Sequence, residues 1–69
     1  MTEDILALAA RHVAEGEERV MQQQLLVEKL ERQGFEARAS DAKLLLATMQ
    51  ETLVLMRDHL CALRSRRMV

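Results

Sequence analysis

Two histidines are the side chains of this sequence best suited to chemistry. His12 and His59 lie in opposite halves of the chain, and Glu15 follows His12 by three residues, close to one helical turn. Imidazole and carboxylate groups both bind zinc and other transition metals. A structural zinc site usually has four ligands at tight spacing, which the string from His12 to Glu15 does not supply. We therefore interpret the histidines as half-buried residues of a helical interface, with His12, His59 and Glu15 as candidate metal ligands.

A related hypothesis concerns pH. If His12 and His59 lie side by side, their protonation at about pH 6 would place two positive charges together and loosen an interface built on them. Cys61 has no base among its expected neighbours on the helix surface, Ala47 and Val54, and a nucleophilic thiol needs one. We predict no catalytic residue, no cofactor and no enzymatic activity.

A second candidate site is the basic end of the chain. Arg64, Arg66 and Arg67 could contact phosphate groups, as in a Rop-like hairpin dimer that binds nucleic acid. However, residues 1–36 contain eight acidic and four basic side chains, and a polyanion-binding protein is usually basic throughout. We therefore interpret the arginines as compensating a helix dipole, and keep nucleic-acid binding as the alternative function.

The composition predicts helices and a single domain, residues 1–69. The chain has no Pro, Trp or Tyr, two Gly and 49% apolar residues. A chain this short cannot bury a large core alone, so we expect self-association. The longest apolar run, Ile5–Ala10, has six residues, the first residues are acidic and there is one cysteine, Cys61. These features predict no membrane span, no signal peptide and a cytoplasmic location.

Apolar residues recur in alternating steps of three and four in two stretches, the pattern of helices that pack along one seam. We predict helices over about residues 3–33 and 38–66, which gives an all-α antiparallel hairpin. The first seam is Leu6, Ala9, Val13, Gly16, Val20, Gln23, Val27 and Leu30. The second seam is Ala42, Leu46, Met49, Leu53, Met56, Leu60 and Leu63.

Local signals predict the helix ends. Thr2 is expected to cap the first helix, and Gly34 to end it in a left-handed conformation with Phe35 folding back on Leu30. Ser40 is the chemically preferred cap of the second helix, although that helix could also begin near Ala37.

Pairing the two seams separates two flanks of the hairpin. One flank brings Glu17 near Arg57 and Glu31 near Lys43, which are opposite charges suited to water. The other flank is apolar and brings His12 near His59, so we predict that it pairs with a second copy in a C2 four-helix bundle. The expected interface residues are Ile5, Leu8, Leu26, Leu45, Thr52 and Leu55. A polar layer near its middle is expected from Arg19, Gln22, Gln23, Gln24 and Thr52.

The sequence resembles a group of short bacterial proteins without a characterised activity. The resemblance rests on HVAEGE from His12 to Glu17 in the first helix, and on a TLxLxRxHL pattern from Thr52 to Leu60 in the second. It implies a two-helix fold in which the histidines recur, and it implies no activity. We expect a small self-associating interaction module, an adaptor or regulator that could also bind another helical protein.

Overall fold

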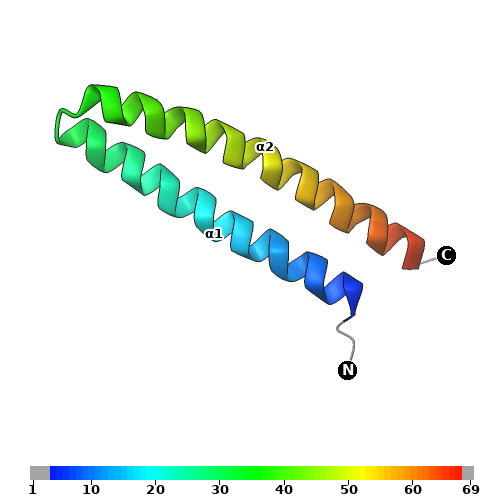
Figure 1. The fold of residues 1–69 in the computed structure, drawn as a ribbon. Coiled ribbons are helices and arrows are strands. Elements are labelled where there is room, and N and C mark those ends of the chain that lie inside the picture. The colour runs from blue at the N-terminus through cyan, green and yellow to red at the C-terminus, as the bar shows by residue number, and fades with distance from the viewer. Residues whose placement is uncertain (1–3, 68–69) are drawn as a thin grey trace.

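Two antiparallel helices joined by a tight turn form the whole fold (Figure 1). The computed structural model describes residues 4–67, with the backbone alone for Arg67. Helix α1 spans Ile5–Arg32 and α2 spans Glu36–Arg67, and the chain measures 52 × 22 × 13 Å along its principal axes. The predicted all-α helical hairpin is confirmed. Within the described residues, neither helix combines the length and the apolar character needed to cross a bilayer.

Asp4 caps the N-terminus of α1. Its carboxylate accepts a hydrogen bond from the backbone N–H of Leu6 at 3.1 Å, which satisfies one of the free donors of the first turn. The prediction that Thr2 caps a helix from about residue 3 was wrong, since α1 begins at Ile5; Thr2 itself lies outside the described residues. An aspartate carboxylate caps a helix at least as well as a threonine hydroxyl, and both residue types stand near the start of this helix.

The C-terminus of α1 ends as predicted. Gly34 has a φ of +78°, and its N–H donates to the carbonyl of Glu31 at 3.1 Å. The N–H of Phe35 donates to the carbonyl of Leu30 at 3.0 Å. These two bonds are the Schellman pattern, which satisfies the last carbonyls of the helix and reverses the chain within three residues. Lys29 and Arg32 lie in the last turn, where the dipole favours positive charge.

Helix α2 begins earlier than predicted. Its first residue is Glu36, and the N–H of Ala39 already donates to the carbonyl of Phe35 at 2.8 Å. Ser40 therefore lies inside the helix, not at its cap, and the helix ends at Arg67 instead of about residue 66. The reason is packing: Ala39 is only 3% exposed, so the first turn of α2 lies directly against α1. The small alanine lets the backbones approach where the turn holds them together.

The core is the predicted seam, extended by one residue. Ala39 is the buried position that the prediction missed, although it continues the alternating steps backwards from Ala42. Within the described residues, the core members are Ala9, Val13, Val27, Ala39, Ala42, Leu53 and Leu60. No described side chain is less than 2% exposed. One seam between two helices therefore gives a thin core.

Two ion pairs fix the register of the seam. Lys43 lies 2.7 Å from Glu31, and Arg57 lies 3.5 Å from Glu17, which confirms both predicted pairs. All four side chains are about half exposed, so each pair contributes less than about 1 kcal/mol. Gly16 leaves room in the seam for long side chains of α2. A Cβ atom at Gly16 would lie 3.1 Å from Leu53 Cδ1 and 3.4 Å from Met56 Cε.

Substitution of Gly34 should destabilise the turn through its backbone alone. No atom lies within 4 Å of the place where a Cβ would stand, so Gly34→Ala is expected to cost about 1 kcal/mol from the positive φ. That corresponds to a decrease in melting temperature of about 4–8 °C at equal protein concentration. Gly34→Asn should lose less, because Asn tolerates this conformation. Equal melting of Gly34→Ala and the wild type by circular dichroism would contradict the assignment.

Candidate functional site

One long side of the hairpin carries most of the candidate residues, and we call it the histidine edge. Helical spacing places its members three or four residues apart on each helix, next to the seam. On α1 they are Ile5, Leu8, His12, Glu15, Arg19, Gln22 and Leu26. On α2 they are Leu45, Thr48, Thr52, Leu55, His59 and Ala62. All six predicted interface residues belong to this edge.

The apolar members of the edge are poorly covered within a single chain. Ile5 is 64% exposed and Leu55 is 68% exposed, while Leu26 and Leu45 are about half exposed. Fully burying a leucine or isoleucine side chain is worth about 1.5–3 kcal/mol relative to leaving it in water. The edge therefore holds unused apolar surface along most of the hairpin.

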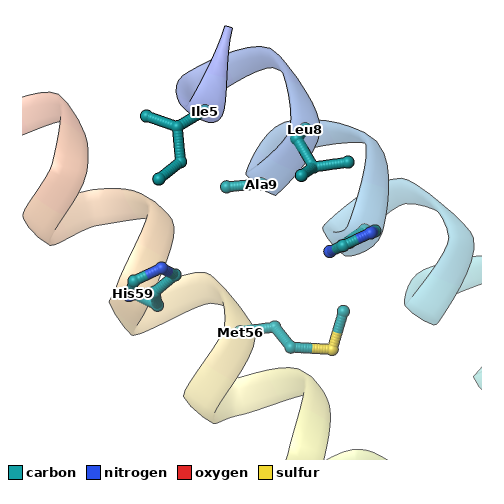
Figure 2. Close-up of a pocket in the computed structure, with 6 residues that line it drawn as sticks. Ile5, Leu8, Ala9, Met56 and His59 are labelled. Carbon is teal, nitrogen blue, oxygen red and sulfur yellow. The ribbon is translucent and has the colours of Figure 1, made fainter. Parts of the chain in front are cut away.

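His12 and His59 lie at the open end of the hairpin, one on each helix, but both are exposed in the single chain, so the prediction that they are half-buried was wrong. Both line a cavity of about 270 Å³. Figure 2 shows Ile5, Leu8 and Ala9 of α1 facing Met56 and His59 of α2 across it. Among the residues that the structure describes, the remaining lining is apolar, and the two imidazoles are the polar side chains. Its mouth opens to solvent along the histidine edge.

Glu15 and Cys61 do not join the histidines in that cavity. Glu15 forms ion pairs along its own helix, with Arg11 at 3.8 Å and with Arg19 at 4.0 Å. Cys61 is exposed. Among the residues that the structure describes, no three histidine, cysteine or acidic side chains are placed to hold one metal ion. Two imidazoles alone fall short of a zinc site, which leaves the apolar contact as the chemistry of this cavity.

The middle of the edge is polar, as predicted, but with fewer members. Arg19 and Thr52 line a second cavity of about 140 Å³ together with Thr48. Both threonine hydroxyls donate to carbonyls of their own helix, Thr48 to Leu44 and Thr52 to Thr48. The charged groups at the centre of the edge are therefore the Arg19 guanidinium and the Glu15 carboxylate, which lie 4.0 Å apart.

The predicted glutamine layer is split between different surroundings. The amide of Gln23 donates to the carbonyl of Ala42 at 3.0 Å across the seam. Gln22 instead reaches Glu18 on its own helix at 3.5 Å. Gln24 is exposed. Only Gln23 therefore links the two helices, while Arg19 and Thr52 contribute to the edge.

The basic end of α2 is exposed at Arg64 and Arg66, and the side chain of Arg67 lies outside the described part. Arg11, which could have enlarged this patch, pairs with Glu15. The proposed phosphate contact therefore depends on the arginines of the last turns of α2.

A further set of exposed apolar residues lies outside the predicted interface, and it includes Met21, whose apolar side chain at helical spacing was interpreted as core filler. Met21, Leu25, Leu44 and Val54 are all more than half exposed and lie outside the histidine edge. Their signal was present in the sequence, since they are apolar residues at positions away from both seams. Leu25, Leu44 and Val54 were overlooked because scattered exposed apolar residues are normal on protein surfaces.

Comparisons with protein-family models, with curated proteins and with solved structures each gave no match. The resemblance to short bacterial two-helix proteins therefore stays a prediction. The geometry of the hairpin is therefore the basis for its proposed function.

Zinc should not stabilise the hairpin. Because only His12 and His59 converge, an equimolar addition of Zn²⁺ is expected to leave the melting temperature unchanged. The matched control is the double variant His12→Gln/His59→Gln, which should behave in the same way. An increase in melting temperature that the double variant loses would contradict this expectation and identify a metal site.

Proposed function

We propose that this chain is a non-catalytic interaction module that works as a homodimer, in which two hairpins pack along their histidine edges into a four-helix bundle. The observation that carries this proposal is the exposure of large apolar side chains along one continuous edge of a one-layer hairpin. A second hairpin would cover Ile5, Leu8, Leu26, Leu45 and Leu55 and close both cavities. Four-helix bundles bury such positions in this way.

The surface area of the single chain supports association. A compact folded protein of 7.9 kDa exposes about 4,400 Å², whereas this hairpin exposes 5579 Å². The excess is of the order of the 800 Å² that each partner contributes to a typical stable interface. The radius of gyration points the same way, since 15.8 Å exceeds the roughly 11 Å of a compact chain of this length.

The opposite flank supports the choice of edge. There the Glu17–Arg57 and Glu31–Lys43 pairs join charged groups that are already satisfied by each other and by water. Burying them would cost desolvation free energy that their mutual attraction rarely recovers. The histidine edge has no such charge along its two apolar ends, so it is the side that gains most from leaving water.

The dimer would still present apolar side chains on its outside. Met21, Leu25, Leu44 and Val54 lie away from the histidine edge and stay accessible in such a bundle. Met21 and Leu25 lie one turn apart on α1, a spacing that suits the groove or face of another helical protein. This supports a role as an adaptor or regulator, with the homodimer as the scaffold.

The homodimer predicts different effects for two equally exposed leucines. Leu55, 68% exposed, lies on the histidine edge, whereas Leu44, 69% exposed, does not. Leu55→Asp would bury a carboxylate in the interface and should raise the dissociation constant at least about 100-fold, or about 3 kcal/mol. Leu44→Asp should change it little. Sedimentation velocity measures both.

Two results would contradict the proposal. One is a monomeric wild type at micromolar concentration. The other is equal association of the Leu55→Asp and Leu44→Asp chains. Circular dichroism on the same samples separates dissociation from loss of the helices, since Leu44→Asp places the same charge on the same helix.

Nucleic-acid binding, the alternative function, has less support because Arg64 and Arg66 stand on a chain with a net charge of −1. We expect no retardation of RNA or DNA in gel-shift assays at low salt. A complex that weakens steeply as salt rises, and that is lost in Arg64→Gln/Arg66→Gln, would instead favour the alternative.

A further inference from the structure

We infer that the two hairpins of the dimer run antiparallel, with Glu15 of each chain paired with Arg19 of its partner. This inference rests on the proposed homodimer and specifies its orientation. A two-fold axis would cross the bundle at right angles near its middle, so that α1 lies against the partner's α1 and α2 against the partner's α2. The alternative is an axis along the bundle, which would place α1 against the partner's α2.

The charges at the centre of the edge favour the antiparallel orientation. Glu15 and Arg19 are one turn apart on the same side of α1, and their side chains are 46% and 70% exposed. An axis along the bundle would place Arg19 against the partner's α2, whose edge residues include no carboxylate. An axis across it exchanges the two positions, so that each carboxylate meets a guanidinium. Opposite charges across an interface set orientation more than they add affinity.

The positions of the other edge residues are compatible with the same antiparallel orientation. An axis that relates residue 15 to residue 19 also relates Leu8 to the partner's Leu26 and His12 to the partner's Gln22. On α2, the corresponding axis relates Thr52 to the partner's Leu55, Thr48 to the partner's His59 and Leu45 to the partner's Ala62. All of these residues belong to the histidine edge, and no charged residue among them faces a like charge; Ile5, the remaining member of the edge on α1, falls opposite the partner's Lys29.

One axis can serve both helices because their midpoints lie at the same level. The midpoint on α1 falls at residue 17, and the midpoint on α2 falls between residues 53 and 54. Gly16 lies against Leu53 and Met56, with its Cβ position 3.1 Å from Leu53 Cδ1. Arg57 also reaches Glu17 at 3.5 Å. The packing of the hairpin itself therefore aligns the two symmetry points to within about one helical turn, or 5.4 Å.

The shape of the edge also favours the antiparallel orientation. The cavity of about 270 Å³ lies at the open end, between His12 and His59. Leu26 and Leu45 stand on the same edge at the turn end, and both protrude from the hairpin. An antiparallel partner lays its two leucines over this cavity. A parallel partner would instead place two hollows together at one end and four leucines at the other.

Cross-linking of single-cysteine chains tests the orientation. Each variant carries Cys61→Ala and one of Leu8→Cys, Leu26→Cys or Leu45→Cys, and one chain of every equimolar pair carries a tag so that the mixed dimer is separable by mass. A short bis-maleimide linker then joins cysteines that face each other. In the antiparallel dimer, Leu8→Cys with Leu26→Cys should give mostly mixed dimers. Each variant alone should give few, because equivalent positions lie about 27 Å apart along the helix.

The matched controls decide between the orientations. Leu26→Cys with Leu45→Cys should cross-link only in the parallel arrangement, and Leu44→Cys, which lies outside the edge, should cross-link with neither. A predominant Leu26–Leu45 product, or a dimer in which Leu8→Cys and Leu26→Cys do not react together, would overturn the antiparallel orientation. Sedimentation of the same mixtures before cross-linking separates this outcome from failure of the proposed function, because the latter would show monomers.

Discussion

A hairpin of two helices is one layer thick, and both the thin core and the exposed apolar surface of this protein follow from that constraint. Each helix can bury only the stripe that meets its neighbour, so the core is a single row of contacts from Leu6 and Leu63 at the open end to Ala39 near the turn. The best-buried residues of this row are alanines, valines and leucines. Such a row fixes the pairing of the helices, but it leaves much apolar surface in water.

The two sides of the hairpin resolve this exposure differently. One side is ionic, and its Glu17–Arg57 and Glu31–Lys43 pairs hold the register while remaining hydrated. The other side is apolar at both ends and charged only at its centre, around Glu15 and Arg19. In the proposed dimer the apolar ends would supply the tendency to associate, because hydrophobic burial is nondirectional. The charged centre would set the orientation, because each Glu15 meets a partner guanidinium only when the two chains run antiparallel.

The position of the histidines in the hairpin limits the roles that they can have. As isolated residues they are compatible with metal binding, but the structure places them in an apolar cavity with no third ligand among the described residues. In the proposed dimer each imidazole would face a neutral amide or hydroxyl group of the partner. A histidine there would serve as a polar group of a helical interface. The hypothesis of a pH-sensitive interface therefore stays a prediction with a defined location.

The sequence by itself determined the features that depend on neighbouring residues: two helices, the break at Gly34, the seams and the charge pairs that follow from their register. These are local because helical hydrogen bonds and side-chain periodicity extend over only a few residues. The tertiary structure decided between the two starts of α2 that the sequence left open: the helix begins at Glu36, beside the Ala37 alternative, with Ala39 buried against α1. It also decided that His12 and His59 stay exposed where they line one cavity, although the sequence predicted them half-buried. Such choices depend on contacts between residues far apart in the chain, which the spacing of residue types narrows but does not fix.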